Sequence, residues 1–133
     1  KGVGYLIGDG NNHIPFTYVE DVAQMFVNAV TSRLNDTFLI VGKEPTQREV
    51  YSLAAEYLGV DVNLKSVSYS MAGLFAKINQ LRGSIITQEH VNILYYNRMF
   101  ESIKAKEMLN FNPTPFEKGL RQVVDAFVNW DKN

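Results

Sequence analysis

The sequence contains no cysteine, which excludes a disulfide framework and a thiolate metal site. It also lacks a long apolar run. None approaches the roughly 18 residues that span a membrane, and the first residues have no signal-peptide character. An excess of charge is missing too, because the formal net charge is only −1. Nucleic acids and anionic membranes attract strongly basic surfaces, so we expect neither as a partner and expect a cytoplasmic protein.

What is present is an ordinary globular composition, with 46% hydrophobic and 20% charged residues. A chain of 133 residues forms one domain or part of one. Such a chain buries roughly two thirds of its unfolded surface, so it can build a real core. We find no internal repeat, low-complexity tract or linker, and we therefore expect residues 1–133 to form a single subdomain.

The pattern of apolar residues predicts a mixed α/β fold that is mostly helical, with five or six helices and three or four short strands. The expected strands are residues 5–7, 14–19, 37–41 and 60–67. The expected helices are residues 20–32, 46–58, 70–81, 87–95, 102–109 and 114 onward. The continuous apolar run at 37–41 is typical of a strand that is buried on both faces.

Short signals mark several helix ends. Thr46 and Glu49 have the spacing of a capping box, and Gly59 stands where a helix commonly ends in the left-handed conformation. Thr87 is expected to cap a helix of its own. Before the last helix, Thr114 is a typical N-cap residue and Pro115 a typical first helical residue.

Two helices carry apolar residues at helical spacing, which predicts faces that pack against a core. In the helix that begins near Glu20, these residues are Val22, Phe26, Ala29 and Val30. In the last helix, they are Phe116, Leu120, Val123, Val124, Phe127 and Val128.

Residues 4–10 match the spacing G-x-x-x-G-x-G, which occurs in dinucleotide-binding turns. A phosphate-binding turn needs a strand before its glycines and a helix N-terminus after them. Only three residues precede Gly4, and the segment that contains Pro15 cannot open a helix. We therefore interpret this segment as a strand with two tight turns and expect no cofactor-binding residue in it.

Four residues are candidates for substrate binding: Asn12, His13, Arg82 and Arg98. Asn12 and His13 lie in a polar loop before an expected strand, and loops carry many binding residues. Arg82 and Arg98 lie in polar breaks, and guanidinium groups are common anion ligands, although surface arginines are more often only solvated. With two histidines in distant segments and no cysteine, we expect no metal site.

An alternative from another class of function is that the chain is a free-standing helical binding module. Its most specific version is a helix-turn-helix that binds DNA. The helix at 46–58 has the character of a first helix of that motif. A recognition helix should then follow within about four residues. Residues 61–64 look extended instead, and a basic patch is missing.

Four pieces, in order, resemble the extended short-chain dehydrogenase/reductase family, which is also called the NAD-dependent epimerase/dehydratase family. They are Gly8–Gly10 with Phe16–Ala23, then Thr37–Gly42 with Pro45–Glu49, then Ser102–Ala105, and last Met108–Pro115. The third is similar to the family's "S-K-A" and the fourth to its "E-L-G-F-x-P-x-P". Together they cover nearly the whole chain.

The family's active site uses a Tyr-x-x-x-Lys pair, and none of the seven tyrosines is followed by lysine four residues later. The resemblance therefore implies the C-terminal, substrate-side portion of a Rossmann-type enzyme without its N-terminal dinucleotide-binding part. It implies NAD or NADP in a full-length enzyme, and no cofactor, cofactor-binding residue or catalytic residue on this chain alone. The chain alone is expected to be inactive.

Family members that act on nucleotide sugars often have Arg-Asp where this chain has Ile14 and Pro15. The arginine of this pair binds the phosphates of the nucleotide, so this chain lacks that binding group for a diphosphate. The resemblance thus leans to the dihydroflavonol-reductase-like or steroid-dehydrogenase-like branch, and the expected substrate is a nucleotide sugar or a hydroxy or keto compound. We also expect a homo-oligomer, because an unpaired strand at 37–41 would invite pairing with another chain.

Overall fold

The computed structural model describes residues 2–80, 83 and 85–130. Contacts divide the chain into two compact units, and each is described by itself. The first consists of Lys1–Ile14 and Thr46–Arg98, and the second of Pro15–Pro45 and Met99–Asn133. Among the described residues, no helix has the length and apolar character needed to cross a membrane.

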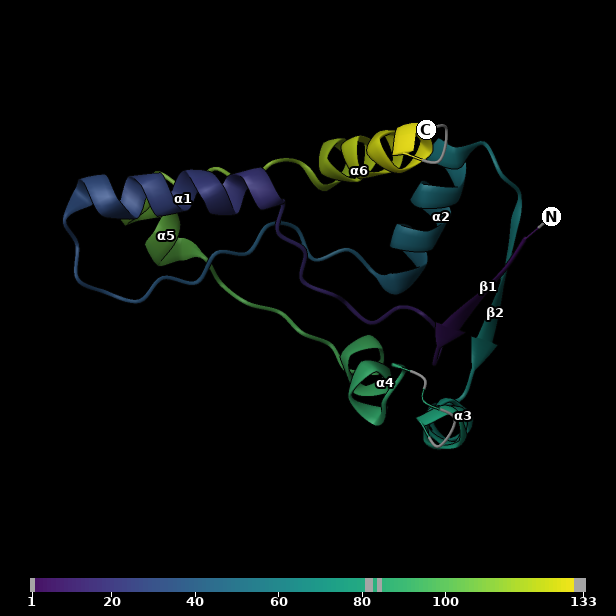
Figure 1. The fold of residues 1–133 in the computed structure, drawn as a ribbon. Helices are drawn as coiled ribbons and strands as arrows, with labels where there is room; N and C mark the ends of the chain where they lie inside the picture. The colour runs from purple at the N-terminus through teal and green to yellow at the C-terminus, as the bar shows by residue number, and fades with distance from the viewer. Residues whose placement is uncertain (1, 81–82, 84, 131–133) are drawn as a thin grey trace. The chain divides into compact units, whose positions relative to one another are not determined.

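The first unit contains two parallel strands, β1 (Gly2–Ile7) and β2 (Val62–Val67), which lie side by side in Figure 1. Their register runs from Gly2 opposite Val62 to Ile7 opposite Val67. The helix α2 (Gln47–Leu58) comes before β2 and contacts both strands. The strands that the sequence predicts at 5–7 and 60–67 are thereby confirmed.

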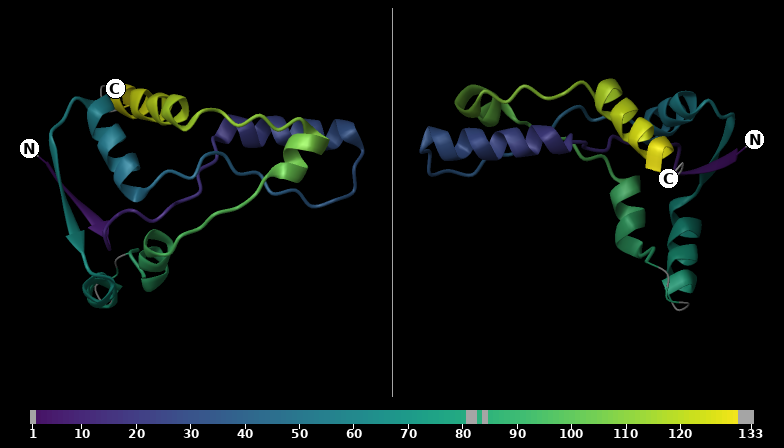
Figure 2. Two further views of the ribbon diagram at one scale, coloured as in Figure 1. Left: turned by 180° about the vertical axis from the view of Figure 1, so that it is seen from behind. Right: turned by 45° about the horizontal axis from the view of Figure 1, so that its top comes forward.

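Two further helices complete the first unit, α3 (Tyr69–Gln80) and α4 (Gln88–Tyr95). They pack against each other (Figures 1 and 2). The small residues Ala72 and Ala76 of α3 are buried against Val91 of α4. Gly73 allows this close approach, because a Cβ atom there would lie 2.7 Å from Oε1 of Gln88.

The predicted caps of α2 are confirmed. The backbone N–H of Glu49 donates to Oγ1 of Thr46 (3.2 Å), and the N–H of Thr46 donates to Oε2 of Glu49 (2.6 Å). At the other end, Gly59 adopts φ 65°, a left-handed conformation that glycine reaches without strain. The sequence signals therefore gave the correct boundaries of this helix.

The second unit contains α1 (Val19–Ser32), α5 (Ile103–Leu109) and α6 (Phe116–Trp130). The helices α1 and α5 pack together, as Figure 1 shows. Their contact buries Met25, Ala105, Leu109 and Phe111 in one cluster. Six helices thus lie within the described residues, in agreement with the predicted mixed α/β class.

Two predicted strands, at 14–19 and 37–41, are wrong: the structure has two strands in its described residues rather than three or four. The two segments do meet, since Gly42 N–H donates to Phe16 O (3.0 Å) and Phe16 N–H donates to Lys43 O (3.4 Å). Two such bonds do not make a ladder. Within 37–41, Phe38 and Ile40 pack on the core cluster, while Leu39 is 48% exposed. The apolar run therefore does not lie in a sheet with both faces covered.

The predicted core-facing stripes are only partly correct. On α1, Phe26 is 70% and Val30 is 80% exposed, and Met25 is buried in their place. On α6, Phe116 and Val124 are buried, but Phe127 is 64% exposed. Helical spacing predicts that one face is apolar, but a face is buried only where another element lies against it.

Candidate functional site

A groove in the first unit is the main candidate site, and it lies where the turn after β1 meets the end of α4. Its lining residues are Ile7, Gly8, Asp9, Asn11, Asn12, Tyr95, Tyr96 and Asn97, around a volume of about 620 Å³. Half of these side chains are carboxylate or amide groups, and two are aromatic rings. The groove is therefore more polar than most small-molecule sites, whose linings are mainly apolar, and it offers several hydrogen-bonding groups.

Asn12 lines this groove and is 8% exposed. Its Nδ2 donates to the Leu94 carbonyl (2.5 Å), and its Oδ1 accepts from Nε2 of Gln47 (3.3 Å). Gln47 is also buried, and its Oε1 accepts from the N–H of Ile7 (2.8 Å). These bonds join β1, α2 and α4 at one point and hold the groove's wall in place. The predicted role of Asn12 in substrate binding stays a prediction.

His13 and Arg98 lie next to each other, beside the groove-lining residue Asn97. The N–H of His13 donates to Oδ1 of Asn97 (2.7 Å), and the His13 carbonyl accepts from the N–H of Arg98 (3.1 Å). A single bridge also pairs His13 with Thr46. Three of the four predicted site residues, Asn12, His13 and Arg98, thus come together, while Arg82 lies outside the described residues.

The sequence analysis missed the aromatic wall of the groove. The rings of Tyr95 and Tyr96 stand nearly perpendicular, at 80°, with centroids 5.2 Å apart. Tyr69 of α3 supports both rings, at 4.6 Å from Tyr95 and 6.1 Å from Tyr96. A hydrogen bond with Tyr69 raises the pKa of Tyr96. The adjacent tyrosines at the end of α4 were the sequence signal that could have predicted this wall. Their third member, Tyr69, is distant in sequence, so the cluster itself could not be predicted.

Asp9 is the charged residue among the described groove-lining residues, and the Arg48 guanidinium donates to its backbone carbonyl (2.6 Å). Its carboxylate accepts from the backbone N–H of Asn11 (2.9 Å) and from Nδ2 of the same residue (3.1 Å). The backbone hydrogen bond is the main reason that the pKa of Asp9 is lowered, because an accepted N–H favours the ionised form. Asp9 therefore presents a negative charge at the mouth of the groove at neutral pH.

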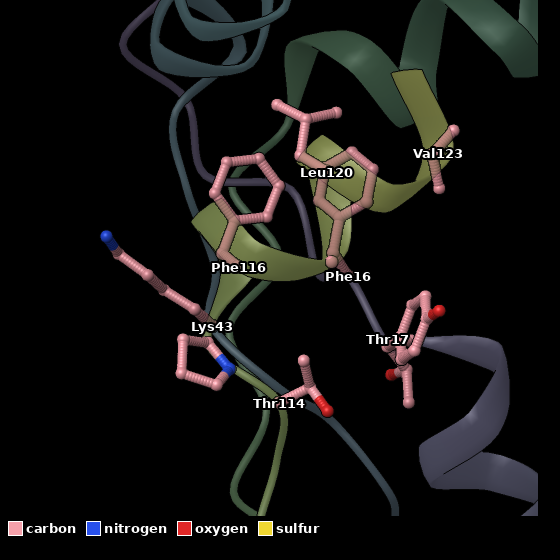
Figure 3. Close-up of a pocket in the computed structure, with 10 residues that line it drawn as sticks. Phe16, Thr17, Lys43, Thr114, Phe116, Leu120 and Val123 are labelled. Atoms are coloured by element: carbon pink, nitrogen blue, oxygen red, sulfur yellow. The ribbon is translucent and has the colours of Figure 1, made fainter. Parts of the chain in front are cut away.

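A second, smaller pocket lies in the second unit, and Figure 3 shows its lining side chains. Its volume is about 150 Å³. Phe16, Phe116 and Leu120 point toward one another in Figure 3, and the two rings are 5.5 Å apart. Lys43 also lines it, with its Nζ 2.7 Å from Oε1 of Glu117. Lys43 is paired with Glu117, and the Thr114 hydroxyl donates to Asp21 (2.7 Å), so we take this small pocket as the weaker candidate for chemistry.

The motifs that carry the family resemblance hold the second unit together. Asp21 accepts from both the N–H (2.8 Å) and the hydroxyl (2.7 Å) of Thr114. In the S-K-A-like piece, Ser102 donates to the Val41 carbonyl (3.1 Å), and Ala105 is fully buried. Lys104 pairs with Asp36 at 2.5 Å. These residues hold segments of the second unit together. This structural role is enough to explain why these residue types occur here.

The glycine turn at residues 4–10 does not fit a dinucleotide phosphate. A Cβ atom on Gly4 would lie 2.8 Å from the Leu64 side chain, and one on Gly10 would lie 2.7 Å from the Leu6 side chain. These glycines thus make room for the protein's own side chains. The segment from Asn11 to Tyr18 is not helical, so it presents no helix N-terminus to a pyrophosphate.

Acidic and histidine side chains do not gather into a metal-binding group of three anywhere in residues 2–80, 83 and 85–130. The two candidate sites must therefore be judged by their hydrogen-bonding and apolar groups.

No protein-family model matches the chain. Two curated relatives do: isoforms 1 and 2 of the 3beta-hydroxysteroid-dehydrogenase/decarboxylase from Arabidopsis thaliana, with 27% and 29% identity. Each match covers 92% of this chain but only 33% and 26% of the relatives. The chain thus spans a third or less of the length of these enzymes.

Solved structures agree on the fold. The UDP-glucuronic acid 4-epimerase from Bacillus cereus in complex with NAD matches 91% of this chain with a TM-score of 0.60 and 17% identity, over 31% of its own length. The protein gox2253 has a TM-score of 0.69 and 17% identity, over 94% of this chain and 39% of its own. RMD from Pseudomonas aeruginosa, complexed with NADPH, has a TM-score of 0.60 and 14% identity, over 91% of this chain and 34% of its own.

The described architecture corresponds to the C-terminal part of these Rossmann-type neighbours. The curated relatives agree with the lean to the steroid-dehydrogenase-like branch. The likenesses in sequence and fold agree with the resemblance to the extended short-chain dehydrogenase/reductase family, also called the NAD-dependent epimerase/dehydratase family.

Proposed function

We propose that this chain is the substrate-binding portion of an NAD(P)-dependent sugar epimerase, dehydratase or reductase, and that it does not transfer hydride by itself. The observation that carries the proposal is the groove of about 620 Å³ beside Asn12, His13 and Arg98. It offers recognition groups, whereas the sequence has no Tyr-x-x-x-Lys pair. In such an enzyme the cofactor supplies the hydride, and these residues hold and orient the substrate.

The site residues divide the work by chemistry. The backbone of His13 is hydrogen-bonded to the side chain of Asn97 and to the backbone of Arg98, which holds this part of the site in place. The Asn97 side chain has an amide donor, and the Arg98 side chain has guanidinium donors. Donors of this kind bind the oxygen atoms of hydroxy and keto compounds. The buried Asn12–Gln47 pair keeps the wall rigid, which lowers the cost of ordering the site around a substrate.

Calorimetric titration of the purified chain with NADH and NADPH tests the absence of a cofactor site. We expect no saturable heat, because the glycine turn packs on Leu6 and Leu64. A micromolar dissociation constant for either nucleotide would contradict the proposal. The genomic sequence upstream of Lys1 offers a second test: a reading frame with a G-x-x-G-x-x-G turn and a Tyr-x-x-x-Lys pair is expected.

The alternative, a helix-turn-helix that binds DNA, has no observation in its favour. After α2 the chain turns at Gly59 and enters β2 at Val62. A recognition helix would have to occupy that segment.

A further inference from the structure

We propose that the small pocket of the second unit is a binding site for an uncharged apolar molecule of about six to eight carbon atoms. The pocket lies between the segment that leads into α1 and the first turns of α6, and Figure 3 shows it. Among the described residues, its lining has no member in common with that of the groove in the first unit. The inference therefore goes beyond the proposed function and does not depend on it.

The inner walls of the pocket are apolar. The rings of Phe16 and Phe116 lie 5.5 Å apart at 54°, and Leu120 points toward both of them (Figure 3). Phe116, Leu120 and Val123 recur at helical spacing, so they lie on one face of α6. Phe116 is 9% exposed and Phe16 is 38% exposed, which leaves one wall accessible from solvent.

The two threonine hydroxyls of the lining already have partners in the protein. Thr17 donates to the carbonyl of Ile40 (3.0 Å), and Thr114 donates to Oδ1 of Asp21 (2.7 Å). A polar ligand would have to compete with these bonds, whereas an apolar ligand leaves them intact. Because burial of a polar group without a partner is unfavourable, the lining favours an apolar ligand.

The charged groups beside the pocket are paired with each other. Nζ of Lys43 lies 2.7 Å from Oε1 of Glu117, so one positive and one negative charge occupy the same place. The Tyr18 hydroxyl, which also belongs to the lining, interacts with the Glu20 carboxylate. An anionic ligand would have to displace Glu117 from Lys43, and a cationic ligand would have to displace Lys43. The charges therefore favour an uncharged ligand.

Gly119 keeps part of the pocket open. A Cβ atom at this position would lie 3.4 Å from Cδ2 of Tyr18, so any side chain would occupy space between α6 and that ring. Gly119 lies within α6, where glycine favours the helix less than alanine does. The helix thus carries a destabilising residue at the point where the pocket lies.

The volume of the pocket limits the size of the ligand. It is about 150 Å³, and an apolar protein cavity of about 150 Å³ stays dry and binds benzene. Transfer of an apolar molecule from water into such a lining is favourable in proportion to the apolar area that it buries. A complete nucleotide exceeds this volume.

The test is an NMR titration of the 133-residue chain with toluene, butylbenzene, benzoate and benzylamine. We expect toluene to shift the ring protons of Phe16 and Phe116 in a saturable manner. Benzoate and benzylamine should bind at least roughly tenfold more weakly, because burial of their charges is not compensated. Butylbenzene should also bind more weakly, because it exceeds the volume. No saturable shift with toluene, or equally tight binding of any other probe, would overturn the inference.

Gly119→Ala tests whether the probe occupies the pocket. The added methyl group narrows the space, so toluene should bind at least roughly fivefold more weakly, as expected when a filled site is overpacked. The same change should raise the melting temperature of the ligand-free chain, because alanine favours the helix. Gln122→Ala, on α6 outside the described lining, is the matched control and should leave binding unchanged. Equal affinities for toluene in the two variants would overturn the inference.

Leu120→Ala makes the opposite change and keeps the inference testable if Gly119→Ala is unstable. Removal of most of the leucine side chain enlarges the pocket, so butylbenzene should gain affinity relative to toluene by roughly threefold or more. This ratio is measured within one variant, so a change in stability does not affect it, and an unchanged ratio would contradict the site. Binding of NADH or NADPH would contradict the proposed function alone, because these nucleotides are larger than the pocket.

Discussion

Asp21 belongs to the family-like segment Phe16–Ala23, and its contacts show what one residue of that segment does in the folded chain. Its position in the first turn of α1 suits the helix dipole, but its main partner is distant. Both carboxylate oxygens accept from Thr114, 93 residues away. Thr114, expected to cap α6, instead gives its hydroxyl to Asp21. The two residues connect the start of α1 with the segment that leads into α6.

Replacement of Asp21 by Ala should destabilise the chain by about 1–3 kcal/mol, because it removes two hydrogen bonds to a charged group. Glu20→Ala is the control. It removes an exposed carboxylate from the same helix turn and should cost about 0.3–1 kcal/mol. Urea denaturation measures both. In a double-mutant cycle with Thr114→Val, additive losses would contradict the direct interaction.

The ion pair between Lys43 and Glu117 should make stability depend on pH. Lys43 lowers the pKa of Glu117 from its ordinary 4.5, so the folded state favours the carboxylate. The contribution is therefore complete above pH 4.5 and is lost as the pH falls through the lowered pKa. Both side chains are about half exposed, which limits the contribution to about 0.2–1 kcal/mol.

Thermal unfolding from pH 6 to pH 3 at low salt measures this effect in Lys43→Met. We expect a lower melting temperature than wild type at pH 6 and a smaller difference at pH 3. Lys118→Met, in the first turn of α6, is the matched control. If the difference in melting temperature between wild type and Lys43→Met is the same at every pH, Lys43 acts through packing alone.

At the scale of elements, α4 begins with an unusual capping arrangement. The backbone N–H of Thr87 donates to Nδ1 of His90 (3.1 Å), and the Thr87 hydroxyl lies 2.9 Å from the same atom. His90 thus takes the place that Glu or Gln has in a capping box. Because α4 has only eight residues, its start depends strongly on this cap.

His90→Ala should destabilise α4 by about 0.5–1 kcal/mol through loss of this acceptor. His90→Gln should retain most of the stability, because the Gln side chain can accept from the same N–H. Amide hydrogen exchange along residues 88–95 detects the change locally. Equal protection in the two variants would mean that the cap does not stabilise the helix.

At the scale of the whole molecule, exposed apolar helix faces favour association. Phe26 and Val30 form such a face on α1, and Leu74, Phe75 and Ile78 form another on α3, where they are 42–59% exposed. Contiguous apolar surface of this kind commonly mediates contacts between proteins. The homo-oligomer expected from the sequence therefore stays a prediction, and helix faces now support it in place of a free strand.

Sedimentation equilibrium of the chain should show a dimer or a larger oligomer. Phe26→Glu should shift the distribution toward monomer, because it places a charge in the apolar face of α1. Gln24→Glu puts the same charge on the opposite side of the helix and should leave the distribution unchanged. A monomeric wild-type chain at high concentration would refute the prediction.

The sequence by itself determined the six helices and several of their ends. The capping box at Thr46, the left-handed Gly59 and the helix start at Thr87 depend on residues a few positions apart, so local signals sufficed. The family resemblance was readable for the same reason: its pieces are short and occur in order. Asn12, His13 and Arg98 could be named as separate candidates from the polar segments that contain them, but the sequence did not predict that they lie close together.

Only the tertiary structure decided which surfaces are covered and which groups meet. The apolar run at 37–41 has the composition of a buried strand, but a strand forms only where another one pairs with it. Phe26 has helical spacing, yet no element of the described chain covers it. The groove itself depends on contacts between residues 35 to 84 positions apart, such as Asn12 with Gln47 and His13 with Asn97. Local propensity carries no information about such distant partners, because they are chosen by packing of the whole chain.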